Sequence, residues 1–260
     1  MRALIAGMAL MFRTHLVALV WSRRALLCVL LAILPPAIGT LVPPNEGALA
    51  AVAALSGLML LMGVAPLIGL LVGSAVVTEE VENRTITFVF TRPVPRAALF
   101  LGRWLATLAV VAPLCAASAL AISQVALWER PDQALPAGLQ ARAALSAALT
   151  GTIYSLLAAG LGVFLKRPMI VGLGYAFAVE GLLANLPLSS QKLSLQYYLR
   201  GVLADLREPP HPGFWSELPM FQMTTFLSPA ESGMRLGVLI AVALVLCTWW
   251  ITRRQFLLSS

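Results

Sequence analysis

The stretch ALAAVAALSGLMLLMGVAPLIGLLVGSAVV, residues 48–77, decides the class of fold. It contains no charged residue, and Ser56 and Ser74 are its only hydroxyl side chains. A helix needs about 20 mainly apolar residues to cross the hydrocarbon core of a bilayer. The stretch is therefore long enough to span a membrane and to project beyond it, and Pro66 predicts a kink within it.

Five further apolar runs predict spanning helices on either side of this one. They are residues 25–42, 98–126, 143–165, 169–187 and 236–251. The composition agrees, because 60% of the chain is hydrophobic and 11% is charged, whereas soluble domains are about 45–50% apolar and about 25% charged. The sequence predicts an all-α integral membrane protein with six transmembrane helices, in a single domain over residues 1–260.

Residues 1–24 predict a helix that lies in the membrane interface. Arg2, Arg13 and Arg24 are spaced by eleven residues, close to three helical turns, and so form one basic stripe on an apolar helix. A spanning course is less favourable, because Arg13 at the centre of a span would cost about 2.5–3.5 kcal/mol on insertion scales.

The positions of the basic residues predict the orientation of the chain. Its net charge is +7, and the parts predicted to be cytoplasmic carry twelve basic residues and three acidic ones, whereas the outer loops carry six and seven. The twelve are Arg2, Arg13, Arg23, Arg24, Arg84, Arg92, Arg96, Arg103, Lys166, Arg167, Arg253 and Arg254. The positive-inside rule places both termini in the cytoplasm. The positive charge thus reads as an insertion signal, and no nucleic-acid partner is predicted.

Several chemical functions have no support in the sequence. A P-loop needs glycine directly before its lysine, but Leu165 precedes Lys166 and Gln191 precedes Lys192. The three cysteines lie in separate apolar runs, and the two histidines lie outside the predicted spans. We therefore predict no catalytic residue, no metal site and no nucleotide hydrolysis by this chain.

Two features of the spans leave alternatives open. Glu180 is the one acid deep in a predicted span, so it either lines a translocation pathway or is a hydrogen-bonded structural group. Gly69 and Gly73 form a Gly-x-x-x-Gly pair that permits close helix packing, either within the chain or between two copies.

The outer loop, residues 188–234, is too long to be a plain connector. Apolar residues placed among polar ones over 193–203 predict an amphipathic helix, and Pro209-Pro210 ends it. The apolar patch at 214–221 predicts a second element, at the membrane surface or dipping into it.

The cytoplasmic segment 78–97, TEEVENRTITFVFTRPVPRA, combines charge with an apolar face. Its three acids either open a helix or extend the second span. Val81, Thr85 and Phe88 share one helical face that would fit a groove on a partner, and Arg92-Pro93 forces an extended break. Taken alone, these residues also allow a plain solvated hairpin.

The same segment resembles the signature of the ABC-2 type permeases. The similarity lies in Glu80-x-Glu82, Thr85-Ile86, Thr91-Arg92-Pro93-Val94-x-Arg96 and Leu99-x-Leu101-Gly102-Arg103. Arg84 stands where the family usually has glycine, and Pro95 where serine is common. The six predicted spans, the N-terminal interfacial helix and the long outer loop are similar too.

The resemblance implies the permease subunit of an ATP-binding cassette exporter in the bacterial inner membrane. Two copies would form a homodimer, and two copies of a separate ATPase would hold ATP and Mg, so that this chain needs no cofactor. A periplasmic accessory protein is a further implied partner. The implied ATPase-coupling residues are Glu79, Glu80, Glu82, Arg84, Thr85, Phe88, Arg92, Pro93 and Arg96. The alternatives are a non-transporting membrane anchor that transmits force, or an intramembrane enzyme.

Overall fold

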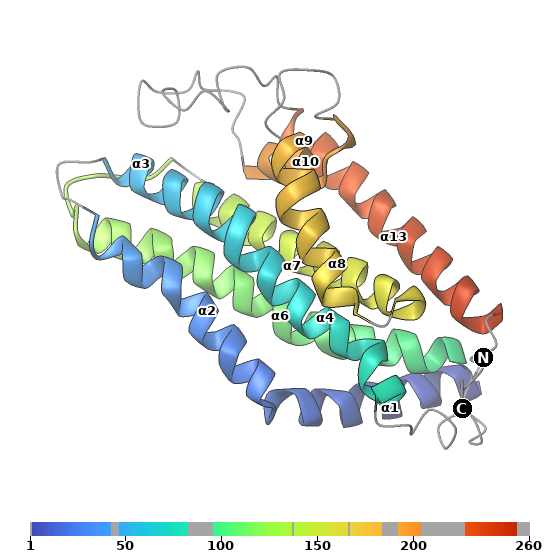
Figure 1. The fold of residues 1–260 in the computed structure, drawn as a ribbon. Coiled ribbons are helices and arrows are strands. Elements are labelled where there is room, and N and C mark those ends of the chain that lie inside the picture. The colour runs from blue at the N-terminus through green and yellow to red at the C-terminus, as the bar shows by residue number, and fades with distance from the viewer. Residues whose placement is uncertain are drawn as a thin grey trace.

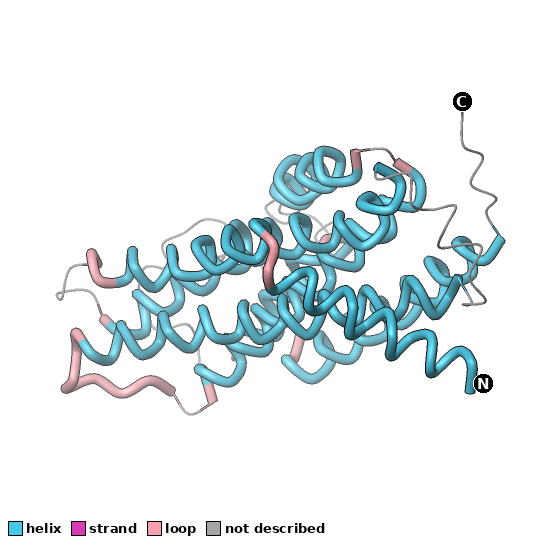
Figure 2. Tube along the Cα trace, turned by 90° about the horizontal axis from the view of Figure 1, so that it is seen from below, coloured by secondary structure: helices cyan, strands magenta, loops and turns pink. Residues whose placement is uncertain are grey.

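The computed structural model describes residues 2–42, 47–82, 96–136, 138–165, 167–183, 192–203 and 227–253, and the regular elements in those ranges are helices (Figure 2). The predicted all-α class is confirmed. The helices are α1 (Arg2–Val20), α2 (Arg23–Gly39), α3 (Ala48–Ala53), η1 (Ala54–Val64), α4 (Ala65–Glu82), α6 (Arg96–Trp128), α7 (Leu139–Phe164), α8 (Pro168–Leu173), η2 (Gly174–Val179), α9 (Glu180–Leu183), α10 (Leu195–Leu203) and α13 (Pro229–Arg253). Of these, η1 and η2 are π-helical.

Within the ranges that the structure describes, four helical stretches are long and apolar enough to cross a membrane. They are Ala54–Val76, Ala97–Trp128, Leu139–Phe164 and Pro229–Arg253. The pair α1 and α2 passes the same test together but is bent by 66°, and Pro168–Val179 is a shorter apolar helix. A multi-pass membrane protein is therefore confirmed, while the count of six spans stays a prediction.

The helices form a bundle with two distinct ends (Figure 1). Helix α7 is the most buried of the long helices and packs against α4 and α6, whereas α13 lies on the outside and is largely exposed. Helix α1 lies across one end of the bundle, and α3, α9 and α10 lie at the other (Figure 1). We refer to these as the α1 end and the α10 end.

The predicted single helix over residues 1–24 is wrong in its last turn. Helix α1 ends at Val20, and α2 begins at Arg23 after a bend of 66°. The Ser22 hydroxyl accepts a hydrogen bond from the Ala25 amide at 3.1 Å, which caps the start of α2. Arg24 therefore belongs to α2 and does not continue the stripe of Arg13 along α1.

The second predicted span changes its helical geometry next to its proline. It begins with α3 and continues as the π-helix η1, which ends at Val64, and α4 begins at Ala65, one residue before Pro66. Proline has no amide hydrogen and so cannot bond to the carbonyl four residues earlier. The change from π to α turns therefore falls beside Pro66, and the predicted kink there stays a prediction.

The glycine pair on α4 serves packing within the chain. A Cβ atom added at Gly69 would lie 2.6 Å from the Gly151 carbonyl oxygen of α7, and one added at Gly73 would overlap the backbone of Ser155. The absence of side chains therefore lets the α4 and α7 backbones approach closely. This settles the question left open by the sequence in favour of a contact between helices of one chain.

We expect Gly73→Ala to destabilise the protein by about 1–3 kcal/mol, because α4 and α7 must move apart to admit the methyl group. The measurement is the thermal unfolding midpoint of the detergent-purified protein. Gly63→Ala is the matched control on the same helical run, since nothing lies within 4 Å of a Cβ atom there. Equal midpoints for the two variants would contradict this account of the packing.

Candidate functional site

A buried carboxylate lies at the centre of the α10 end. Glu180 has no exposed surface, and its two oxygens accept four hydrogen bonds. Oε1 accepts from the Tyr175 hydroxyl at 2.7 Å and from the Leu195 amide at 3.0 Å. Oε2 accepts from the Ser194 hydroxyl at 2.6 Å and from the Gln196 amide at 3.1 Å. Each oxygen therefore meets one hydroxyl and one backbone amide.

These bonds make Glu180 the cap of helix α10. The first amides of a helix have no partner within the helix, and a negative charge beside them is favourable. Helix α10 begins at Leu195, so its first two amides are the ones that Glu180 accepts. A capping group normally sits directly before its helix. Here it comes from α9, and it thereby fastens α10 to the α8–α9 segment.

Gln196 connects α10 to two further helices. Its side-chain nitrogen donates to the Leu61 carbonyl of η1 at 3.0 Å and to the Tyr154 hydroxyl of α7 at 3.1 Å. Tyr154 has no exposed surface, and Gln196 is almost completely buried. Through Gln196 and Glu180 together, one turn of α10 holds elements from three separate predicted spans.

Arg200 adds a positive charge one turn further along α10. It is 4% exposed, and one of its Nη atoms lies 3.6 Å from the Met62 sulfur of η1. Burial lowers the pKa of Arg200 to about 10, while the negative charge of Glu180 acts in the opposite direction. Arg200 therefore stays protonated near neutral pH, and the cluster contains charges of both signs, as buried charges require.

Both π-helical segments take part in this cluster. The segment η1 supplies the Leu61 carbonyl and Met62, and η2 supplies Tyr175 and leads directly into Glu180. Short π-helical turns occur frequently at functional sites. Within the described ranges no group of three His, Cys, Asp or Glu side chains could hold a metal ion. The chemistry of the cluster is hydrogen bonding that holds helices together.

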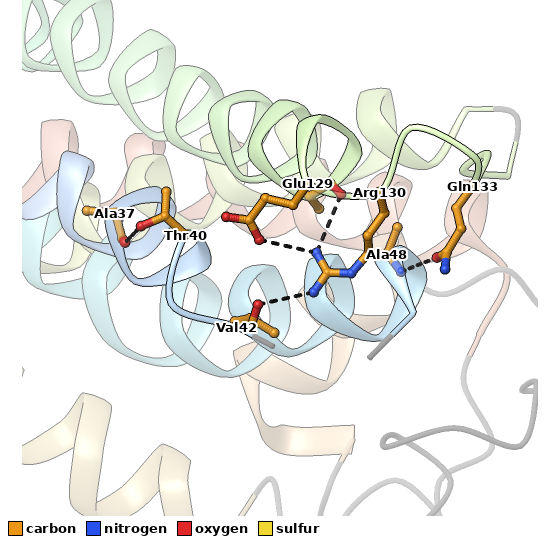
Figure 3. A network of polar contacts seen from close by, with 8 residues as sticks. Ala37, Thr40, Val42, Ala48, Glu129, Arg130 and Gln133 are labelled. Carbon is orange, nitrogen blue, oxygen red and sulfur yellow. Dashed lines mark hydrogen bonds and ion pairs between the residues drawn. The ribbon is translucent and has the colours of Figure 1, made fainter. Parts of the chain in front are cut away.

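A second polar network fastens the connection between α2 and α3 at the same end (Figure 3). The buried guanidinium of Arg130 donates to the Val42 carbonyl at 3.4 Å and lies 3.6 Å from the Glu129 carboxylate. The Gln133 side-chain oxygen accepts from the Ala48 amide, the first of α3, at 2.6 Å. The link between α6 and α7 thus caps the start of α3 and binds Val42, which follows α2.

The α1 end has a different character. Helix α4 continues beyond the apolar stretch as far as Glu82, and α6 begins at Arg96. One Nη atom of Arg103 donates to the Val76 carbonyl at 3.2 Å and so links α6 to α4 just below this extension. A separate hydrophobic cluster lies here, with members from α4, α6, α7 and α13. Its buried residues are Val76, Phe100, Trp104, Leu156, Ala159, Val163 and Ile251.

Helix α1 packs on the first turns of α6. A Cβ atom at Gly102 would lie 2.9 Å from the Met11 Cβ, so the glycine allows the two helices to touch. His15 is buried on the same side of α1. Burial lowers the pKa of His15 to about 4, and the positive charges of Arg103 and Arg24 lower it further. His15 is therefore neutral near pH 7, and the contact with α6 carries no charge from α1.

The structure places part of the predicted coupling segment. Glu79, Glu80 and Glu82 lie on the last turns of α4, so the acids extend the second span, one of the two predicted alternatives. Arg96 is the first residue of α6. The remaining predicted residues fall outside the described ranges; they are Arg84, Thr85, Phe88, Arg92 and Pro93. Their coupling role stays a prediction, as does the second outer element at 214–221.

For Glu180 the structure shows the hydrogen-bonded arrangement in full, and its role in a translocation pathway stays a prediction. The sequence reading missed the partners of Glu180. Gln196 and Arg200 lie one helical turn apart within an otherwise apolar stretch, and that spacing is a signal for a shared buried face. Nothing in the sequence near Tyr154 indicates that it belongs to the site.

We expect Glu180→Gln to destabilise the protein by about 1–3 kcal/mol. An amide nitrogen would replace one carboxylate oxygen and meet a buried backbone N–H, which would lose its acceptor. The thermal unfolding midpoint measures the effect, and Glu231→Gln is the control, since Glu231 is exposed on the first turn of α13. If both variants unfold at the wild-type temperature, Glu180 does not hold α10.

Comparison with known proteins agrees with the resemblance seen in the sequence. The chain matches the model of the ABC-2 family transporter proteins over residues 3–255. No curated protein matches it. The matched range runs from the first turn of α1 to just beyond the end of α13 and includes both ends of the bundle. The chain therefore belongs to the ABC-2 transporter family and is the membrane subunit of a transporter.

Proposed function

We propose that this chain is the permease of an ATP-driven exporter. Two copies pair in the bacterial inner membrane, and each binds one copy of a separate ATPase through residues 78–97. The family match carries this proposal. ATP and Mg belong to the ATPase, in keeping with a sequence that lacks a P-loop. The spans are almost uncharged, which favours a hydrophobic or amphipathic substrate.

The α1 end is the cytoplasmic end in this proposal. Positive residues concentrate in cytoplasmic segments of membrane proteins, and this end carries the starts of α1, α2 and α6 with their arginines. The acids on the extension of α4 are negatively charged, whereas the other charged residues at this end are mostly positive. A partner surface of complementary charge can recognise this arrangement. We therefore assign the ATPase contact to Glu79, Glu80 and Glu82 together with Arg92 and Arg96.

The geometry of the α1 end suits the transmission of force. Residues 83–95 connect α4 to α6, so a displacement of this segment pulls on both helices. The hydrogen bond from Arg103 to the Val76 carbonyl links the same two helices. The hydrophobic cluster around Phe100 and Trp104 connects these helices to α7 and α13. A movement that starts at the ATPase contact therefore reaches four long helices without crossing a loop.

The α10 end has the opposite property. Glu180 caps α10, Gln133 caps the start of α3, and Arg130 holds the Val42 carbonyl in the connection after α2. Opening this end within one chain would expose these buried polar groups, each at a cost of about 1–3 kcal/mol. We therefore place the exit for substrate between the two copies, each of which keeps its own α10 end intact.

We expect the double variant Glu80→Lys/Glu82→Lys to lose at least tenfold in substrate-stimulated ATP hydrolysis. Reversed charge would repel the basic groups that face these acids on the ATPase, at about 1 kcal/mol or more for each contact. The assay uses the permease co-expressed with its ABC ATPase partner, and co-purification and ATP hydrolysis are measured together. Glu231→Lys at the α10 end is the control.

Unchanged co-purification and unchanged hydrolysis would contradict the assigned contact. A membrane anchor that only transmits force is the main alternative, and it shares the same ATPase contact. Transport into inverted vesicles separates the two, because an anchor would couple to the ATPase and move no substrate. An intramembrane enzyme would turn over its substrate without any ATPase present.

A further inference from the structure

Helix α1 has an apolar face that no described part of the chain covers. Ile5, Leu10, Val17 and Val20 are each more than half exposed, and Arg13 lies exposed among them. A helix that faces water normally presents polar residues on that side. An outward face of large apolar side chains with an arginine in its middle is typical of a helix lying in a membrane interface.

This face is not simply the result of loose packing. The opposite side of α1 carries the buried residues His15 and Leu19, and it contacts α6 around Gly102. Helix α1 therefore has one face that packs on α6 and a separate face that is exposed. Helix α6, from Arg96 to Trp128, is longer than a bilayer core requires. Its first turns carry Arg96 and Arg103, which places these turns, and the α1 that packs on them, at the membrane surface.

The turn between α1 and α2 marks the level of that surface. Trp21 in this turn is 87% exposed, and tryptophan is enriched at the boundary between membrane and water. Beyond the 66° bend, α2 presents the exposed side chains of Leu26, Leu30 and Ile33. Helix α2 thus enters the hydrocarbon where α1 runs along its surface.

Arg13 lies within the apolar face of α1 and Arg23 at the start of α2, and both are exposed. Neither makes a hydrogen bond or an ion pair with another residue in the described ranges. A guanidinium placed at the boundary of the hydrocarbon needs an anion, and it binds phosphate oxygens through two parallel hydrogen bonds. The long stem of arginine lies on apolar surface while its head reaches the polar layer.

We propose that the elbow formed by α1 and the start of α2 binds anionic phospholipids, with Arg13 and Arg23 on the headgroup phosphates and the acyl chains against the apolar faces. The occupant is a lipid and not a second copy of the chain, because a basic interfacial face is complementary to an anionic leaflet. The inference depends on the membrane setting and is independent of export.

The position of the elbow gives the lipid a mechanical role. Helix α1 rests on α6 at Gly102, next to Arg103, which links α6 to α4. Lipid bound at Arg13 and Arg23 therefore holds α1 in place against the first turns of α6. Those are the turns that follow the segment assigned to the ATPase contact.

The test is lipid retention by the full-length protein. The protein is reconstituted into nanodiscs of equal parts phosphatidylglycerol and phosphatidylcholine, extracted in mild detergent, and its bound lipids are counted by native mass spectrometry. We expect wild type to retain phosphatidylglycerol preferentially. Arg13→Gln/Arg23→Gln should weaken that retention by roughly fivefold per arginine. Arg235→Gln, an exposed arginine at the α10 end, should leave it unchanged.

Equal retention of the two lipids by wild type would overturn the proposal, and so would retention by the double glutamine variant that matches wild type. Arg13→Lys/Arg23→Lys keeps both positive charges and should retain most of the preference for phosphatidylglycerol. Because it changes the same two positions, it shows that a loss in the glutamine variant comes from the lost charge and not from misfolding. Excess inorganic phosphate should not displace the lipid; displacement would show a simple anion site. The readout needs no ATPase, so it stands whether or not the proposed export is correct.

Discussion

A buried carboxylate that needs hydrogen-bond donors organises one end of this molecule. Glu180 cannot lie inside a helical bundle unless its oxygens are satisfied, and the donors come from η2 and from the start of α10. That requirement fixes where α10 begins and how it lies. It also draws in η1 and α7, because Gln196, whose amide Glu180 accepts, reaches Leu61 and Tyr154 with its side chain. Helix α10 is thus an integral part of the bundle.

The two ends of the bundle both contain apolar packing but differ in how many polar contacts hold their helix termini. At the α10 end, Glu180 and Gln133 cap the starts of α10 and α3, and Arg130 binds the Val42 carbonyl after α2, all through directional hydrogen bonds. At the α1 end, apolar packing around Phe100 and Trp104 joins the long helices. Hydrophobic contact is non-directional, so helices can shift against one another there at lower cost. The proposed export function needs this division between a fixed α10 end and a mobile α1 end.

The sequence predicts the helical class, most of the long helices and α10, because apolar length and amphipathic spacing are local signals. It identifies Glu180 as unusual but not its partners. Gln196 bonds to residues 135 and 42 positions away, and no periodicity connects positions so far apart. The bend at Trp21-Ser22 is also missed, since the apolar pattern runs through it and a single serine cap ends it. The π-helical segments have the same composition as ordinary spans and cannot be predicted from pattern.

The most direct test of this division is hydrogen exchange measured by mass spectrometry on the complex with its ATPase in nanodiscs. The exchange of backbone amides is compared between the ADP-bound complex and the complex trapped with ATP and vanadate. The account predicts that the amides of residues 195–203 stay protected in both states, while exchange over residues 78–103 changes. Faster exchange in residues 195–203 on trapping, with no change over residues 78–103, would contradict it.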